Sequence, residues 1–373
     1  MNIPFHRVSN SDEEASAVRE VLESGWWTTG PKSIEFEDKF CSTVNSKYAL
    51  AVSSCTAALH MALEAVGVSD GDEVILPTNT FVATIEAVCY LGARPVLCDI
   101  NSYDHNIDPD KIEDLVSEKT KAIIPVHFGG IPCDMDRIMS IAKLFQLKVI
   151  EDAAHALPSY YNNTIIGSFS DITCFSFYAT KTLSTGEGGM VTTDNPDYFS
   201  RMKVNRIHGI SGDAWKRYSS EGKWRYDIVS QGYKYNMSDI NAAIGLVQLD
   251  KVFKNNDKRE AIARRYIDAF DTNGLDYIKH KNNVRSSWHL FVLKVSNRDI
   301  LYNKLADCSI GASVHFIPLH FQTFYKKKFN FQKELFPISN DVFKKSISIP
   351  IFPDLTEQEQ EYIISKVLEN AKA

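Results

Sequence analysis

The chain has 373 residues, of which 44% are hydrophobic and 24% charged, with a formal net charge of −6. This composition predicts an ordinary globular protein, long enough for one large domain and a smaller one. The negative charge argues against nucleic acid as a partner, because phosphate backbones are bound through clustered Lys and Arg. The short basic run Lys326-Lys-Lys328 is typical of a solvated surface.

The cysteines and the N-terminus bear on location. Seven cysteines without a C-x-x-C pair fit neither a disulfide framework nor a structural zinc site, so no metal is expected. Residues 1–7 lack the apolar core of a signal peptide, and no run reaches the length that spans a bilayer. We therefore expect a cytoplasmic protein without a membrane partner.

The first segments predict two helices and a strand. Residues 11–24 carry apolar positions at helical spacing, with Ser11 as N-cap. Residues 25–31 break this helix and contain Trp26 and Trp27, which either fill the core or offer a flat surface to a ligand or partner chain. A second helix through Ile34 and Phe40 precedes a strand at 48–52.

The strand at 48–52 passes directly into a helix whose first residues, at 53–57, are small and hydroxylated. Free N–H groups and the positive end of the helix dipole make such a start a natural anion site, and phosphate is the obvious candidate. A plain serine N-cap accounts for most helix starts of this kind, so this motif alone does not indicate an anion site.

Strands and helices then alternate along the chain. Short apolar strands separated by crossover helices indicate an α/β fold, with a mostly parallel central sheet covered by helices on both faces. The expected strands lie at 73–76, 95–99, 122–126, 148–152, 172–177 and 188–193, and the clearest helices at 80–90 and 134–145. Together with the N-terminal segment they form an expected large domain of residues 1–250.

The C-terminal part predicts a smaller α+β domain of residues 251–373. A polar, aromatic stretch at 208–231 is too long for a tight connection and indicates a functional or interface loop. A helix at 237–249, a second at 251–270, strands at 287–295 and 312–317 and a closing helix at 357–369 follow.

Three features that could take part in catalysis lie after strand ends or at the start of a helix. Lys181 lies in a hydroxyl-rich loop after the strand at 172–177, and Asp152 and His155 follow the strand at 148–152. A lone lysine is usually a surface residue. A lysine amine, a carboxylate and a hydroxylated helix start are, however, the set that pyridoxal phosphate needs for its aldehyde, its pyridine nitrogen and its phosphate.

Other cofactors fit less well. A dinucleotide site would need G-x-G-x-x-G before a long helix, and Gly186-Glu-Gly-Gly189 has neither the spacing nor the helix. The histidines show no i, i+4 pairing of the kind that ligates a metal on a helix.

With these residues in view, the sequence resembles the nucleotide-sugar aminotransferases, which are fold-type I pyridoxal phosphate enzymes that act on keto sugars. The resemblance covers nearly the whole chain. It is carried by Ser24-Gly-Trp-Trp-Thr-Thr-Gly-Pro31, Ala51-Val-Ser-Ser-Cys-Thr-Ala57, Gly71-Asp-Glu-Val74, Ile124-Pro-Val-His127, Glu151-Asp-Ala-Ala-His155, Ser176-Phe-Tyr-Ala-Thr-Lys181, Gly186-Glu-Gly-Gly189 and Gly232-Tyr-Lys-Tyr-Asn236-Met-Ser-Asp-Ile-Asn-Ala-Ala243.

The resemblance implies roles for individual residues. Lys181 would form the Schiff base and act as general acid–base, and Asp152 would pair with the pyridine nitrogen. Thr56, Ala57 and Ser176 would hold the phosphate, Phe81 and His155 would stack on the two ring faces, and Asn236 would reach the cofactor of the neighbouring subunit in a homodimer. Trp26, Thr28, Arg217, Arg225 and His315 are expected on the substrate side, although His315 reads equally well as a packed strand histidine.

The resemblance also implies a reaction. L-Glutamate would lose its amino group and leave as 2-oxoglutarate. A nucleotide-linked 4-keto sugar, a UDP-4-keto hexose or pentose, would accept the group at C4 and become a 4-amino sugar for a surface polysaccharide such as lipopolysaccharide. A 3-keto-sugar aminotransferase and a non-catalytic regulatory protein on the same fold are alternatives. Related sugar dehydratases carry histidine in place of the lysine, so Lys181 argues against that class.

Overall fold

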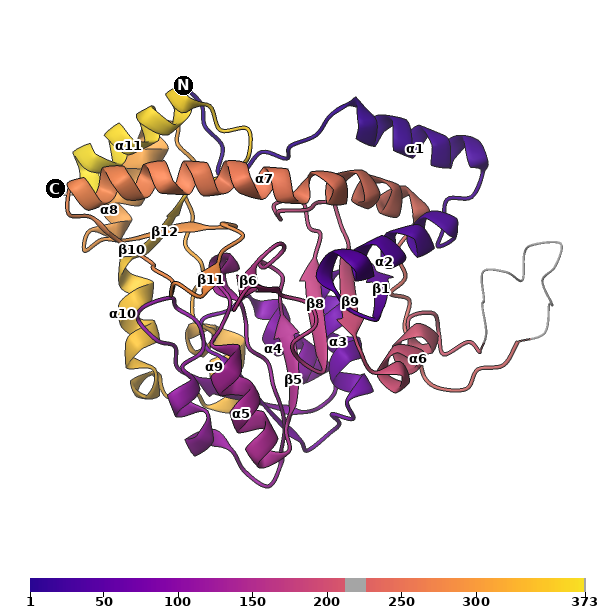
Figure 1. Ribbon diagram of the computed structural model, residues 1–373. Coiled ribbons are helices and arrows are strands. Elements are labelled where there is room, and N and C mark those ends of the chain that lie inside the picture. Colours follow the sequence, from indigo (N-terminus) through magenta and orange to yellow (C-terminus); the bar gives the residue numbers. More distant parts are fainter. Residues whose placement is uncertain (212–225, 372–373) are drawn as a thin grey trace.

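The computed structural model describes residues 1–211 and 226–371 (Figure 1). Within them, seven strands form a central sheet in the order β1-β9-β8-β5-β4-β2-β3. All neighbouring pairs are parallel except those of β9, which runs antiparallel to both β1 and β8. The strands are β1 Tyr48–Val52, β2 Glu73–Pro77, β3 Arg94–Cys98, β4 Thr120–Ile123, β5 Lys148–Asp152, β8 Ile172–Ser176 and β9 Gly189–Thr193.

This arrangement confirms the predicted mostly parallel α/β sheet. Strand β9 is the exception because it follows β8 through a loop without a crossover helix, and such a connection returns the chain antiparallel.

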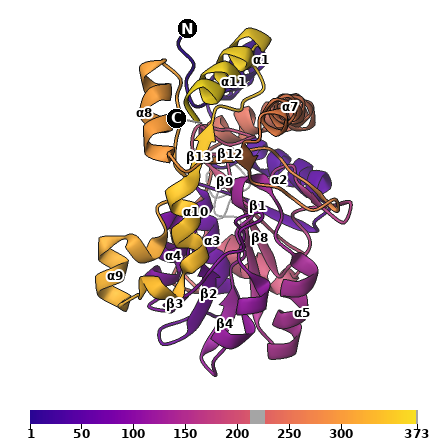
Figure 2. The ribbon, with the colours of Figure 1, turned by 90° about the vertical axis from the view of Figure 1, so that its left-hand side faces the viewer.

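Helices cover both faces of the sheet, as predicted (Figure 2). Because side chains alternate along a strand, Ala49 and Ala51 of β1 face one core, which α2 (Pro31–Val44) and α5 (Met135–Phe145) close. Leu50 and Val52 face the opposite core. That core is closed by α3 (Cys55–Ala65), α4 (Val82–Tyr90) and α6 (Pro196–Asn205).

The two helices predicted at 237–249 and 251–270 are one continuous helix, α7, which spans Asp239–Thr272 and crosses the molecule (Figure 1). The junction contains no Gly or Pro, so nothing in the sequence interrupts the backbone hydrogen bonds there. We propose the division into residues 1–250 and 251–373, which places the boundary inside α7.

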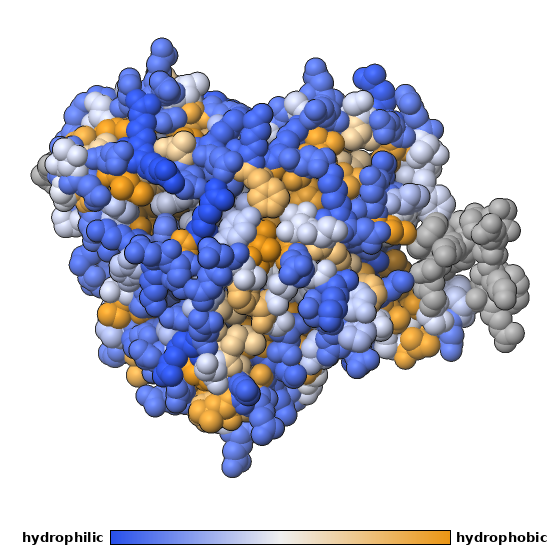
Figure 3. Space-filling view, viewed as in Figure 1, coloured by the Kyte–Doolittle hydropathy of each residue, from blue (hydrophilic) through white to orange (hydrophobic). Residues whose placement is uncertain are grey.

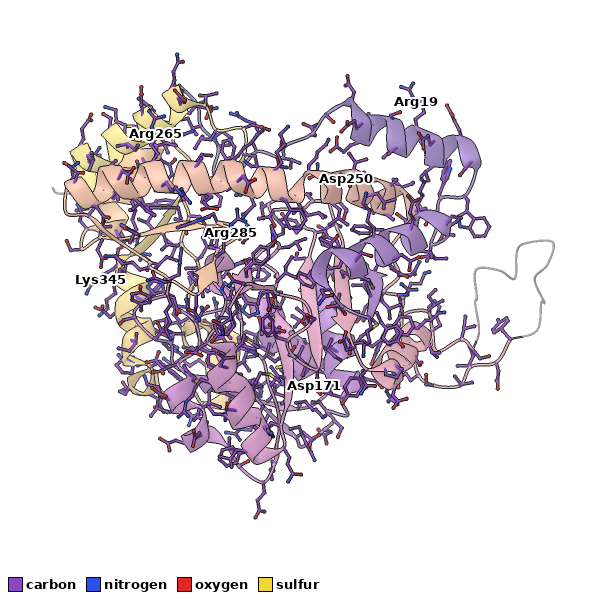
Figure 4. The ribbon with its side chains drawn as sticks, in the orientation of Figure 1. Arg19, Asp171, Asp250, Arg265, Arg285 and Lys345 are labelled. Carbon is purple, nitrogen blue, oxygen red and sulfur yellow. The ribbon has the colours of Figure 1, made fainter. Side chains whose placement is uncertain are left out.

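Charged side chains attach α7 to its neighbours (Figure 4). Arg285 reaches Asp257 at 2.7 Å and Glu260 at 3.0 Å, and Asp250 pairs with Lys39 of α2 at 2.5 Å. These pairs connect the helix to segments far away in the sequence.

The C-terminal elements form a third core against the second half of α7. They are β10 Asp276–Tyr277, β12 Phe291–Lys294, β13 Ser346–Ile349, α8 Arg298–Asp307 and α11 Glu357–Ala371. Ile3 from the N-terminal segment is buried in this core as well.

Of two strand predictions in this region, one is wrong in part and the other is wrong entirely. The strand expected at 287–295 is confined to β12, because the backbone before it turns at Trp288, where φ is 49°, and packs on Gly129 and Gly130. Residues 312–317 form no strand; Ser313 makes one isolated bridge to Ser348, and the N–H of Phe316 donates to the Asn79 side chain. This segment instead lines the cavity described below.

The first helix matches its prediction closely. Helix α1 spans Asp12–Ser24, Ser11 and Glu14 form a reciprocal capping box, and Gly25 ends the helix with φ at 72°. The remaining short elements are β6 Tyr160–Tyr161, β7 Thr164–Ile165, β11 Val284–Arg285, α9 Thr323–Phe329, α10 Pro337–Lys345 and the 3₁₀ turns Pro109–Lys111, Glu113–Leu115, Phe128–Gly130, Leu319–Phe321 and Lys333–Leu335.

The outer surface is mixed in character. The face in Figure 3 carries many hydrophilic residues with hydrophobic ones scattered among them. Among residues 1–211 and 226–371, no helix is both long enough and apolar enough to cross a membrane.

Candidate active site

A cavity of about 420 Å³ lies where the carboxyl ends of the parallel strands meet the C-terminal part of the chain. Loops after parallel strands point to the same edge of a sheet, so residues far apart in sequence converge there. Seven predicted site residues line this cavity, namely Thr56, Phe81, Asp152, His155, Ser176, Lys181 and His315.

Lys181 is held in the loop between β8 and β9. Its N–H donates to the Tyr178 carbonyl at 2.9 Å, and the N–H of Thr185 donates to the Phe177 carbonyl at 2.9 Å. Protein surrounds the side chain except where it faces the cavity. Burial lowers the pKa of Lys181 from 10.5 to about 8, while Cys55 and Asp152 oppose the shift. Such an amine is partly neutral near physiological pH and can act as a nucleophile or base.

Asp152 ends β5, and its side chain is buried. One carboxylate oxygen accepts a hydrogen bond from the Thr84 hydroxyl at 2.8 Å, and the other accepts from the Ala154 N–H at 3.2 Å. Burial raises the pKa of Asp152, because these hydrogen bonds and the charge of Lys181 only partly replace water. The protonated ring nitrogen of the expected pyridoxal phosphate would supply the positive charge that the Asp152 carboxylate lacks.

The start of α3, which the sequence predicts as an anion site, opens onto the cavity. Ser54 caps the helix by accepting from the Ala57 N–H at 3.1 Å, and Ser54, Cys55 and Thr56 line the cavity. A Cβ at Gly189 would lie 2.7 Å from the Ser54 backbone, so only glycine allows β9 to approach this turn. Ala57 is buried behind the lining, with its N–H engaged by Ser54.

Two aromatic residues that the sequence reasoning missed join the predicted Phe81 and His155. The ring centroids of His155 and His289 are 4.3 Å apart, and the ring of Phe316 lies 6.0 Å from His155 and 5.8 Å from Phe81. The Nδ1 atom of His155 accepts from the Gly129 N–H at 3.2 Å, which places the ring proton on Nε2. His289 and Phe316 were assigned to regular strands, where nothing in the pattern marks them as cavity residues.

His315 shows features of both of its predicted readings. It lines the cavity, and it also packs in the protein, where Nδ1 lies 2.9 Å from the Ser348 hydroxyl and the ring stacks on Phe5. Burial lowers the pKa of His315 to about 4, so the ring is neutral near physiological pH.

Trp26, Thr28 and Asn236 do not line the cavity of their own chain. They gather near the start of α7, where Asp239 N–H donates to the Thr28 carbonyl at 3.2 Å. The Trp26 indole donates to the Thr29 carbonyl at 3.1 Å, and the Asn236 amide donates to the Thr29 hydroxyl at 2.6 Å. Arg217 and Arg225 lie outside the described residues.

The residues present fit pyridoxal phosphate. One cavity offers a half-buried lysine amine with a lowered pKa, a carboxylate whose charge is only partly compensated, and hydroxyls at a helix start. In the described part of the chain, no group of three or more His, Cys, Asp or Glu side chains is placed to hold a metal ion.

The fold and this cavity define a pyridoxal phosphate enzyme of the fold-type I class. More particularly, the chain belongs to the DegT/DnrJ/EryC1/StrS aminotransferase family, whose model matches residues 8–368. It is therefore an aminotransferase of a family that acts on sugars, and its cofactor is pyridoxal phosphate.

Three relatives illustrate the similarity. The spore coat polysaccharide biosynthesis protein SpsC of Bacillus subtilis is 44% identical over 378 residues, which cover 99% of this chain and 97% of SpsC. Spr1654 of Streptococcus pneumoniae, provisionally assigned as a sugar aminotransferase and solved in its pyridoxal phosphate form, has a TM-score of 0.93 at 34% identity, covering 100% of this chain and 99% of its own. Helicobacter pylori PseC, an aminotransferase of pseudoaminic acid biosynthesis, has a TM-score of 0.93 at 28% identity, covering 100% of both chains.

Proposed function

We propose that this aminotransferase moves the amino group of L-glutamate to C4 of a nucleotide-linked 4-keto sugar, a UDP-4-keto hexose or pentose. The product is a 4-amino sugar for a surface polysaccharide. The observation that carries the chemistry is the convergence of Lys181, Asp152 and the α3 start on one cavity. The spore coat polysaccharide role in the name of SpsC and the pseudoaminic acid role of PseC support a glycan product.

The residues of the cavity have separate roles in this reaction. Thr56 and Ser176, with the start of α3, hold the phosphate, and Asp152 keeps the ring nitrogen protonated. Pyridoxal phosphate supplies an aldehyde that carries the amino group and a ring that withdraws electrons. The Lys181 amine takes the proton from the α-carbon of glutamate and, in the second half-reaction, delivers one to C4 of the sugar.

The substrate side is expected to use the aromatic and histidine wall. Phe5, Phe81, Phe316 and His315 border the cavity. Aromatic faces and few ionised groups suit a sugar ring, whose own hydroxyls need positioned hydrogen-bond partners. The diphosphate of the nucleotide needs cations, which we assign to Arg217 and Arg225.

We further propose that the enzyme acts in the cytoplasm as a homodimer. Asn236, Trp26 and Thr28 lie together outside the lining of the cavity of their own chain, which supports a role at the cavity of a second copy. Trp27, Tyr226, Ile228 and Val229 are exposed and add apolar surface of the kind that a subunit interface buries.

A direct assay tests the proposed reaction. The protein with pyridoxal phosphate is incubated with L-glutamate and a panel of UDP-linked 4-keto and 3-keto sugars, and the products are identified by mass spectrometry and NMR. We expect an amino group at C4, formed together with 2-oxoglutarate, and no product from the Lys181→Ala variant. Efficient amination of 3-keto sugars without turnover of any 4-keto sugar would assign the enzyme to the alternative specificity.

A further inference from the structure

Two threonine hydroxyls form a chain that runs from the cavity wall to the Asp152 carboxylate. The Oγ1 atoms of Thr80 and Thr84 are 2.8 Å apart, and Thr84 donates to Asp152 Oδ2 at 2.8 Å. Thr84 is fully buried, and Thr80 and Asp152 are almost so. Thr84 lies in the first turn of α4, and Thr80 directly precedes Phe81, the N-cap residue of this helix.

The hydrogen bonds of this chain have a defined direction. A hydroxyl carries one proton, and an ionised carboxylate can only accept. When Asp152 is ionised, the Thr84 proton points to the carboxylate, so the bond between the two threonines must be donated by Thr80. Thr80 lines the cavity, and there it can then only accept.

Helix capping does not explain why a threonine hydroxyl is buried at position 84. The N-cap position of α4 is Phe81, which makes no side-chain capping bond. The hydroxyl of Thr84 instead reaches Asp152, 68 residues away in the sequence, and Thr80. The described residues give this carboxylate one other hydrogen bond, from the Ala154 N–H at 3.2 Å. Thr84 therefore supplies the shorter of the two.

We propose that Thr84 is a positioning residue that holds the Asp152 carboxylate ionised and in one orientation, and that Thr80 acts on Asp152 through Thr84. The consequence for the reaction rests on the proposed role of Asp152 at the ring nitrogen. The relay itself is a property of this chain and can be measured without turnover.

The test measures the protonation of Asp152 in the full-length protein by infrared spectroscopy across a pH series. The Asp152 signal is the carboxyl band that the Asp152→Asn variant lacks. In Thr84→Val, loss of a hydrogen bond to a charged acceptor should raise the protonation midpoint by about one pH unit. Affinity for added pyridoxal phosphate, followed by equilibrium titration, should fall about ten-fold. Thr84→Ser keeps the hydroxyl and should restore both values.

Thr192→Val is the matched control. The Thr192 hydroxyl is also buried and also makes a 2.8 Å hydrogen bond, but to the Gly167 carbonyl, away from the cavity. This variant should leave the protonation midpoint of Asp152 unchanged, even if it lowers the free energy of unfolding. If Thr84→Val does not fold, Thr84→Ala provides the same measurement without a methyl group against the carboxylate.

A double-variant cycle tests the direction of the relay. Thr80→Val should shift the midpoint upward by less than Thr84→Val, and the double variant should shift it no further than Thr84→Val alone. Additive shifts, or a Thr84→Val midpoint equal to that of Thr192→Val, would overturn the relay. Full activity of Asp152→Asn would instead refute the proposed role of Asp152 and leave the relay standing, so the two failures are distinct.

Discussion

Burial moves the pKa values of Lys181 and Asp152 toward each other, although the two side chains have opposite charges and line one cavity. The pKa of the lysine falls to about 8 and that of the carboxyl rises, because desolvation outweighs their mutual attraction. A cofactor with an aldehyde and a basic ring nitrogen offsets the desolvation of both side chains. Its aldehyde reacts with the neutral Lys181 amine, and its protonated ring nitrogen pairs with the Asp152 carboxylate.

The first prediction concerns the pH dependence of cofactor attachment. Only the neutral amine attacks an aldehyde, so the rate at which pyridoxal phosphate links to Lys181 should rise with pH and level off above about 8. Borohydride trapping followed by peptide mass spectrometry measures this rate and locates the linkage. A rate that climbs toward pH 10.5, the ordinary lysine value, would contradict the lowered pKa. Lys181→Ala should trap no cofactor.

The second prediction concerns Asp152. Asp152→Asn should fold normally but lose about 100-fold or more in kcat, because a neutral amide cannot hold the proton on the ring nitrogen. Asp171→Asn is the control: Asp171 flanks β8, pairs with Lys148 at 3.2 Å and lies outside the cavity lining (Figure 4). Its kcat should stay near that of the wild type. Comparable losses in the two variants would mean that the effect on Asp152 is structural.

The third prediction concerns His289, which packs on His155 and whose Nδ1 is buried without a hydrogen-bond partner among residues 1–211 and 226–371. His289→Ala should remove the support of the His155 ring and lower the free energy of unfolding by about 2 kcal/mol. It should also weaken the affinity for pyridoxal phosphate, as measured by equilibrium titration. His289→Phe keeps a ring in this place and should retain most of that affinity. An equal loss in both variants would show that the imidazole nitrogen matters more than the stack.

The strands of the central sheet and most of the cavity could be predicted because both depend on local signals. Strand β5 carries its apolar run directly into Asp152, and the hydroxylated start of α3 marks its own position in the sequence. Thr84, His289 and Phe316 could not be found in this way. His289 and Phe316 reach the cavity, and Thr84 reaches Asp152, only through long-range packing. His289 and Phe316 also lie in segments whose β-rich composition predicted strands that the fold bends away.

The fourth prediction concerns the subunit to which Asn236 contributes. Lys181→Ala and Asn236→Ala should each be inactive alone, while subunit exchange between them should restore about one quarter of wild-type activity. In the mixed dimer, one of the two sites has its own Lys181 and receives an intact Asn236 from the partner. If mass spectrometry proves that mixed dimers form but activity is not restored, Asn236 does not act at the cavity of the partner subunit.

The last prediction concerns Arg217 and Arg225, which lie outside the described residues. If these cations hold the diphosphate of the sugar nucleotide, charge reversal in Arg217→Glu and Arg225→Glu should raise the KM for the keto sugar about ten-fold or more. The glutamate half-reaction, followed by loss of the absorbance of bound pyridoxal phosphate, should stay close to wild type, because glutamate carries no diphosphate. Arg19→Glu on α1 is the control, since this exposed arginine lies outside the cavity lining (Figure 4). Equal damage to both half-reactions would show that these arginines support the fold or the dimer and do not bind the nucleotide.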